Sequence, residues 1–270
     1  MDPVRIRQRA VLLGALRRWF ADHGYLEVQT PVLVPSPALE ATLHGPAVDG
    51  GFLQTSPEMA MKRVLAAGLC RIYQLCPCFR ELEHGPHHAR EFTMLEWYRV
   101  GAGLEELMDE VESLVGACAV ALGTAAPKFT RVPVNTLISP DIVPHMEWFR
   151  TWVNDVEPKL DSPTIVYDYP AWQAALARVR GQSAQRFEAY LGGLELANAF
   201  DEELSAAELN DRWAESDRLR AEEGFAPHPR DPRFLDAVDR MPRCAGIALG
   251  VDRLLMALTG ASHIDDVRVH

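Results

Sequence analysis

The sequence predicts an α+β fold in which helices cover an antiparallel sheet. Strand-like segments come in neighbouring pairs, at 71–79 with 91–99 and at 184–190 with 194–200, and helical segments lie between the pairs. Neither a G-x-G-x-x-G nor a Walker A motif is present, so nothing indicates βαβ nucleotide-binding units. The length of 270 residues suits one domain spanning residues 1–270.

The first element is a predicted helix over residues 4–23, which Gly24 ends. Its periodicity places apolar residues on one side, with arginines between them. These apolar residues are Ile6, Ala10, Leu13, Leu16 and Phe20.

The other elements follow from their periodicity and from the turn residues beside them. A serine cap and an early proline begin a helix at Ser56-Pro57, and Gly192-Gly193 makes a tight hairpin turn between two strands. Strands are expected at 25–28, 52–54, 71–79, 91–99, 164–169, 184–190, 194–200 and 244–250. Helices are expected at 56–68, 104–121, 205–223, 231–240 and from 251. Residues 31–50 have the composition of a loop, and residues 122–160 give no clear pattern.

Composition restricts the environment and the partners. With 48% hydrophobic residues the chain can form a globular core, and no apolar run approaches a membrane span. The net charge of −11 makes the chain a poor non-specific ligand for nucleic acid. The chain has five cysteines, and this odd number argues against a set of disulfides. A zinc site would need a second C-x-C pair, which is absent. The cysteines are therefore expected to be buried thiols in a reducing cytoplasm.

Two arginines are the first candidate site residues. Arg80 closes an apolar strand and Arg253 begins a helix. Guanidinium groups bind phosphate oxygens in a fixed geometry, so two of them could hold a triphosphate without a glycine-rich loop. Taken singly, each arginine is also compatible with an ordinary surface ion pair.

Carboxylates form the second group of candidates. Glu188 and Glu195 flank the hairpin turn, where cross-strand pairing could bring both to one face and make Mg²⁺ on phosphates their natural partner. Further polar residues lie within or beside apolar runs. These residues are Glu58, Glu96, Tyr98, Asn198 and Glu202. Buried carboxylates need cations, which a diamino acid could supply, or else Arg63, Arg99 or other cations of the chain.

These segments resemble class II aminoacyl-tRNA synthetases, and the lysine branch in particular. FRELEHGPHHAREF resembles motif 2, GIALGVDRLL resembles motif 3, and the first helix with residues 25–31 resembles motif 1. TSPEMAMKR, EFTMLEWY and GLELANAFDEE resemble signatures of the lysine branch. The resemblance implies an antiparallel catalytic fold, a homodimer formed through motif 1, and adenylate formation from ATP and a lysine-like amino acid.

The family's residue roles then carry over to this chain. Arg80 would hold the α-phosphate and Arg253 the γ-phosphate, with His88 near the phosphates and Phe92 on adenine. Glu188 and Glu195 would hold Mg²⁺. The amino-acid pocket would be lined by Glu58, Glu96, Tyr98, Asn198, Glu202 and Ala248.

Motif 2 departs from the family pattern at one position. Leu82 occupies the place of a family glutamate, so Glu81 or Glu83 would have to replace it in the ATP site. Ala248 replaces the glycine usual in lysyl-tRNA synthetases. At this position the chain resembles the truncated synthetase paralogues that attach (R)-β-lysine to elongation factor P. Ala248 therefore favours such a ligase over a synthetase.

The acceptor is expected to be a protein rather than tRNA. The catalytic segments begin almost at Met1, which leaves no room for an anticodon-binding barrel, and the chain is acidic. The resemblance therefore implies elongation factor P as the partner. Two other hypotheses remain open, namely an amino-acid sensor without activity, which Leu82 favours, and an adenylating enzyme for another carrier.

Overall fold

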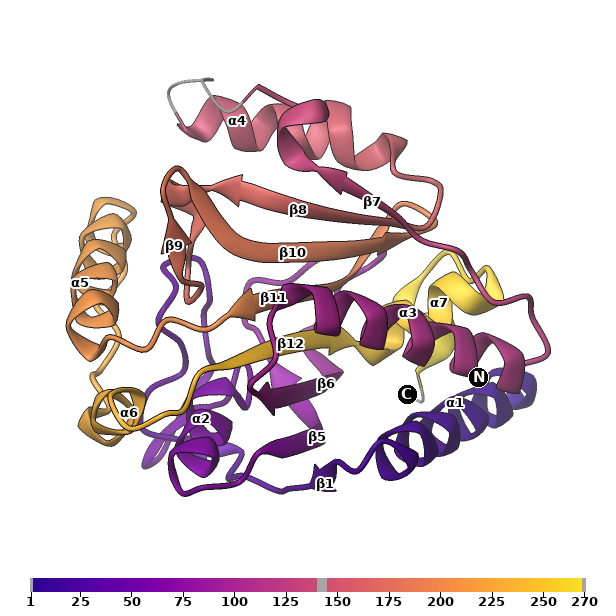
Figure 1. The fold of residues 1–270 in the computed structure, drawn as a ribbon, viewed down its shortest axis with the longest axis horizontal. Helices are drawn as coiled ribbons and strands as arrows, with labels where there is room; N and C mark the ends of the chain where they lie inside the picture. Colours follow the sequence, from indigo (N-terminus) through magenta and orange to yellow (C-terminus); the bar gives the residue numbers. More distant parts are fainter. Residues whose placement is uncertain (1, 140–144, 269–270) are drawn as a thin grey trace.

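The computed structural model describes residues 2–139 and 145–268, and its architecture is the predicted α+β fold (Figure 1). Within these residues a nine-stranded sheet runs through the molecule. Its strands, in spatial order, are β1 (Leu26–Glu27), β5 (Arg71–Phe79), β6 (Glu91–Val100), β12 (Cys244–Gly250), β11 (Leu194–Asp201), β10 (Ser183–Leu191), β8 (Thr164–Pro170) and β7 (Thr130–Pro133), with β9 (Val179–Arg180) beside β10.

The centre of this sheet is antiparallel, but its two ends are not. Strand β1 pairs with β5 in parallel, and β7 pairs with β8 in parallel. The predicted antiparallel sheet is therefore present, with one parallel pair added at each edge. In both cases a long connection separates the two strands in the chain, which a parallel pair requires.

Three helices cover one face of the sheet: α1 (Pro3–Asp22), α3 (Leu104–Ala121) and α7 (Val251–Thr259). Leu95 and Trp97 of β6 point into this core. Helix α1 has the predicted length, and Leu16 and Phe20 of its predicted apolar side are buried, whereas the first two residues of that side are not. Ile6 is 37% exposed and Ala10 is also exposed, because the buried side packs on α3 and centres on Leu16 and Trp19.

Helices α2 (Glu58–Ala66), α5 (Ala206–Glu222) and α6 (Pro232–Val238) pack at the other end of the fold. Ser205 caps α5 as predicted, accepting a hydrogen bond from the Glu208 amide. Helix α4 (His145–Thr151) continues into a π-helical turn (Trp152–Val156), and Trp148 and Trp152 pack near Tyr169 and Tyr190. Part of the segment without a clear sequence pattern therefore contributes tryptophans to a small aromatic core.

The segment 31–50 is not entirely loop. Strands β2 (Leu33–Val34), β4 (Gly51–Leu53) and β3 (Ala47–Val48) form a second, small sheet. Two-residue strands are too short to give an alternating pattern, which is why composition alone suggested a loop. Short 3₁₀ turns complete the described elements, at Val134–Thr136, Glu157–Lys159, Ala171–Gln173 and Ile264–Val267.

Strand register brings three predicted site residues together. Asn198 lies opposite Ala248, and Ala248 lies opposite Glu96, so the three form a row across β11, β12 and β6. The predicted hairpin is present, with Gly192 and Gly193 both at positive φ in the turn between β10 and β11. Four of the five cysteines are buried, as expected, while Cys70 is exposed. None of the helices in the described part of the chain has the length and apolarity needed to cross a membrane.

Candidate active site

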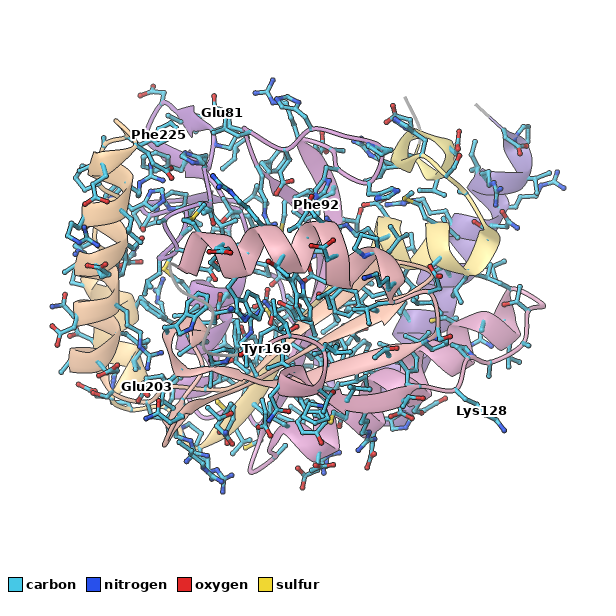
Figure 2. All side chains as sticks on the ribbon, turned by 90° about the horizontal axis from the view of Figure 1, so that it is seen from above. Glu81, Phe92, Lys128, Tyr169, Glu203 and Phe225 are labelled. Atoms are coloured by element: carbon cyan, nitrogen blue, oxygen red, sulfur yellow. The ribbon has the colours of Figure 1, made fainter. Side chains whose placement is uncertain are left out.

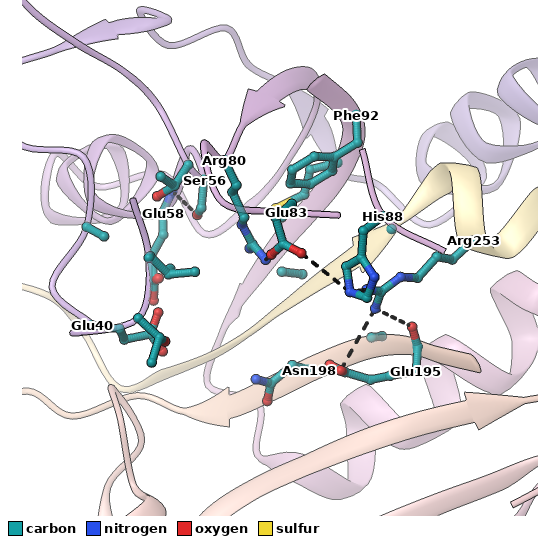
Figure 3. Close-up of a pocket in the computed structure, with 18 of the residues that line it drawn as sticks. Glu40, Ser56, Glu58, Arg80, Glu83, His88, Phe92, Glu195, Asn198 and Arg253 are labelled. Carbon is teal, nitrogen blue, oxygen red and sulfur yellow. Dashed lines mark hydrogen bonds and ion pairs between the residues drawn. The ribbon is translucent and has the colours of Figure 1, made fainter. Parts of the chain in front are cut away.

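One pocket collects most of the predicted site residues (Figure 3). Its walls come from residues 37–43, the start of α2, the loop between β5 and β6, strands β6, β11 and β12, and the start of α7. Arg80, Glu83, His88, Phe92 and Arg253 line one part of it. The other lining residues that the sequence indicated are Glu58, Glu195, Asn198 and Ala248.

Both arginines reach this pocket from elements far apart in the chain. Arg80 directly follows β5, and its guanidinium lies 5.1 Å from the centroid of the Phe92 ring, a favourable cation–π distance. Arg253 lies in the first turn of α7. The Nε atom of Arg80 is buried without a hydrogen-bond partner among the described residues. An unsatisfied buried donor fits an anionic ligand such as phosphate.

A chain of polar contacts connects the two arginines across the pocket. Arg80 Nη1 lies 3.4 Å from Glu83 Oε1, and Glu83 Oε2 lies 3.4 Å from His88 Nε2. Arg253 Nη2 lies 2.6 Å from the same His88 nitrogen. Because guanidinium only donates, that nitrogen accepts and the ring is neutral with its proton on Nδ1. Burial and the charge of Arg253 lower the pKa of His88, in agreement with a neutral ring.

The structure distinguishes the two glutamates that could replace the family residue at Leu82. Glu83 lines the pocket, whereas Glu81 is exposed at the periphery, where its backbone N–H donates to the His44 carbonyl (Figure 2). Leu82 itself is 55% exposed. The expectation that Glu81 belongs to the ATP site is therefore not supported by its position.

Three predicted amino-acid ligands lie behind the pocket wall rather than in it. Glu96, Tyr98 and Glu202 are almost fully buried. Glu96 accepts hydrogen bonds from Tyr98 Oη at 2.5 Å and from Ser56 Oγ at 3.0 Å. Burial, and then the nearby Glu58, raise the pKa of Glu96 well above its ordinary value. The strand register places Glu96 on the pocket side of the sheet. Ser56, which lies just before α2, lines the pocket in its place and donates to the Glu96 carboxylate.

Lys62 provides the cation that the buried carboxylates require. Its Nζ lies 2.7 Å from Glu58 Oε1 and 2.7 Å from Glu202 Oε2, and its side chain is 0% exposed. Burial lowers the pKa of Lys62, but Glu202 and Glu58 outweigh it, so that the pKa is raised and the amine stays charged. Of the chain cations considered from the sequence, neither named arginine is the partner, since Arg99 pairs with Glu110 and Arg63 lines a separate cleft.

The two predicted metal ligands differ in their surroundings. Glu195 lines the pocket, while Glu188 accepts from Tyr169 and Tyr190 and pairs with Arg186 behind it. They are not directly opposite one another, because Glu188 pairs with Asn198 and a bulge shifts Glu195 opposite Tyr190. Burial and the Glu188 charge raise the pKa of Glu195 to about 7. Carboxylates that repel in this way fit a divalent cation, with Glu195 better placed than Glu188.

Sequence reasoning missed three side chains at the site: Glu40, Lys62 and Arg186. The four-residue spacing of Glu58 and Lys62 on one helix was a usable signal. Arg186 contacts the carbonyl of Gln173 and the side chain of Asn198. Glu40 comes from the Pro- and Gly-rich segment, where no periodicity indicates which way a side chain points.

The fold and the pocket define a protein of the class II synthetase type. A family model described as tRNA synthetases class II (D, K and N) matches residues 4–270, and the chain belongs to this family.

Among the similar proteins, several carry the name elongation factor P–(R)-β-lysine ligase. The protein of that name from Vibrio vulnificus is 37% identical over 303 residues, covering 97% of this chain and 94% of the relative. That from Vibrio parahaemolyticus is 39% identical with the same coverage. That from Erwinia tasmaniensis is 38% identical over 300 residues, covering 96% of this chain and 92% of the relative.

Proposed function

We propose that the protein activates (R)-β-lysine, or a closely similar lysine, with ATP and transfers it to a lysine side chain of elongation factor P. The observation that carries the proposal is that Arg80 and Arg253 line one pocket whose other end holds the carboxylates of Glu40 and Glu58. Cationic groups at one end suit a triphosphate, and acidic groups at the other suit an amino acid with two ammonium groups. The names of the relatives agree with this chemistry.

In the first step, a carboxylate oxygen of the amino acid attacks the α-phosphorus of ATP. The bond to the bridging oxygen breaks, pyrophosphate leaves, and the aminoacyl-adenylate remains. The carboxylate is already ionised at neutral pH, so this step needs no general base. Positioning and neutralisation of phosphate charge therefore supply most of the rate.

The pocket residues divide these tasks between them. Arg80 would contact the α-phosphate, where negative charge grows, and Arg253 the γ-phosphate, each exchanging its contacts with Glu83 or His88 for phosphate oxygens. Phe92 would lie against adenine, and Glu83 rather than Glu81 would replace the family glutamate. Glu195, with Glu188 behind it, would hold Mg²⁺, which would neutralise phosphate charge when bound.

In the second step, the neutral amine of the acceptor lysine attacks the adenylate carbonyl. An amide bond forms, AMP leaves, and the amine loses one proton. The acidic chain, with a net charge of −11, favours a protein acceptor over tRNA.

Three further properties belong to this proposal. One catalytic domain over residues 1–270 is supported by the nine-stranded sheet, which contains strands from both halves of the chain. A homodimer through α1 is supported by exposed apolar side chains at Val4, Val11 and Leu26. A cytoplasmic location is supported by the free, mostly buried thiols.

The decisive experiment measures ATP–pyrophosphate exchange with a panel of amino acids, followed by mass analysis of elongation factor P. We expect the strongest exchange with (R)-β-lysine and a mass increase of elongation factor P by one such residue. Exchange with no amino acid would contradict the proposal and restore the sensor hypothesis. Exchange without modification of elongation factor P would indicate another carrier.

A further inference from the structure

Two carboxylates face each other at the end of the pocket away from the arginines. Glu40 and Glu58 both line this end, and Figure 3 shows their side chains pointing toward one another. Among the described residues, none hydrogen-bonds to the carboxylate of Glu40. Two negative charges that face each other in this way repel unless a cation joins them, and burial adds to the cost.

The position of Glu40 is fixed by contacts made by its neighbours. Arg220 Nη1 donates to the Ala41 carbonyl at 2.9 Å, and His228 Nε2 lies 2.9 Å from the Leu43 carbonyl. Leu39 packs with Trp213 and Phe234 in the core beside α5 and α6. The segment therefore holds Glu40 against Glu58 without a partner of its own.

Glu58 is fixed from the opposite side. Lys62 Nζ contacts the Oε1 atom of Glu58, and it also contacts Oε2 of Glu202. The charge of Lys62 is thus shared by two carboxylates, and little of it remains for Glu40. The other charged groups that act on Glu40 are Arg80 and Arg186. Arg80 is the proposed phosphate ligand, and Arg186 already pairs with Glu188.

We propose that Glu40 and Glu58 together bind one ammonium group of the substrate, and that Glu40 thereby selects a diamino acid. The inference rests on the proposed function and adds to it a residue that determines specificity. An ammonium between the two carboxylates would remove their repulsion and give Glu40 its missing partner.

In the free protein, burial and then Glu58 raise the pKa of Glu40, while Arg80, Arg186 and Lys62 oppose this. A bound ammonium lowers that pKa again, so binding releases a proton from the fraction of molecules in which Glu40 is protonated. A side chain with only a structural role would not produce such a linkage.

The test compares the parent protein with Glu40→Gln, which keeps the shape and removes the charge. Asp49→Asn is the matched control, because Asp49 is an exposed carboxylate of the same 31–50 segment. Pyrophosphate exchange is measured with 3,6-diaminohexanoic acid and with 3-aminohexanoic and 6-aminohexanoic acids, each of which lacks one ammonium group.

For Glu40→Gln we expect the KM for the diamino acid to rise about tenfold or more, as for loss of a hydrogen bond between charged groups, with the KM for ATP unchanged. The preference for the diamino acid over one of the two analogues should shrink by the same factor. This ratio does not depend on the fraction of folded protein. A smaller preference over 3-aminohexanoic acid would show that Glu40 binds the 6-amino group. A smaller preference over 6-aminohexanoic acid would show that it binds the 3-amino group.

Calorimetry of diamino-acid binding in buffers of different ionisation enthalpy provides the second measurement. We expect proton release in the parent at mildly acidic pH and less release in Glu40→Gln. An unchanged KM ratio together with unchanged proton release would overturn the role of Glu40 while leaving the proposed function intact. If the parent shows no exchange at all, the proposed function fails, and calorimetry alone then decides whether Glu40 binds the ammonium.

Discussion

Lys62 Nζ lies 2.7 Å from Glu202 Oε2, and this contact ties α2 to the residue that follows β11. Both side chains are almost fully buried, and Lys62 also holds Glu58. A buried ion pair therefore lies directly behind the wall of the proposed amino-acid pocket. The cost of burying an ion depends on its partners, so this contact connects stability with substrate recognition.

Lys62→Met should destabilise the fold by about 3–5 kcal/mol, because it leaves the buried Glu202 and the partly buried Glu58 without their cation. Urea unfolding followed by circular dichroism measures the change. Adding Glu202→Gln to Lys62→Met should recover part of the loss, since the uncompensated charge is then removed. Equal stability of parent and Lys62→Met would show that the pair contributes nothing.

Arg80→Ala should reduce ATP–pyrophosphate exchange by about a hundredfold or more, as for loss of a group that stabilises transition-state charge. Arg63→Ala is the matched control, because Arg63 lines a separate cleft between α2 and α6. Circular dichroism checks that both variants fold. Exchange near the parent rate in Arg80→Ala would refute the assigned role.

Ala248→Gly should weaken the preference between α- and β-lysine, by about tenfold at most, since removal of a methyl group opens the pocket between Asn198 and Glu96. The ratio of kcat/KM values for the two amino acids in pyrophosphate exchange measures this preference. An unchanged ratio would mean that Ala248 does not shape the part of the pocket that distinguishes the two isomers.

His228 should make the stability of the protein depend on pH. Burial, and then Arg220, lower the pKa of His228 from 6.5 to about 4. The unfolded chain therefore binds more protons between these values, and stability present above pH 6.5 is lost as the pH falls toward 4.

His228→Gln keeps a donor for the Leu43 carbonyl and removes the titration, so the variant should lose less stability over this range than the parent. Thermal unfolding at several pH values measures the difference. The exposed His84→Gln is the control and should follow the parent. Parallel curves for His228→Gln and the parent would exclude this origin of the pH dependence.

Val11→Glu should convert a dimer to a monomer, because it places a charge on the exposed apolar side of α1, where Val11 is 44% exposed. Light scattering after size-exclusion chromatography measures the mass. Val153→Glu is the control, since Val153 is 56% exposed but follows α4 at the other end of the molecule (Figure 1). A monomeric parent would contradict the proposed homodimer.

The sequence by itself determined the elements whose signals are local. The limits of β5, α3 and β12 match their predicted ranges, and the Gly192-Gly193 hairpin is present. Apolar periodicity, caps and paired glycines act within a few residues, so they can be read without knowing the rest of the chain. Arg80 and Arg253 were identified from their places at a strand end and a helix start and from the resemblance of their segments to motifs 2 and 3, and both line one pocket.

Tertiary structure alone decided which side chains reach that pocket and what they pair with. Glu83 rather than Glu81 faces it, and Glu96 and Glu202 lie behind it. Lys62 rather than Arg63 pairs with Glu202. Each of these outcomes depends on elements that are distant in sequence, such as α2 packing over β6. Burial and ion pairing are set by such distant neighbours, whereas propensity and periodicity are set by adjacent residues.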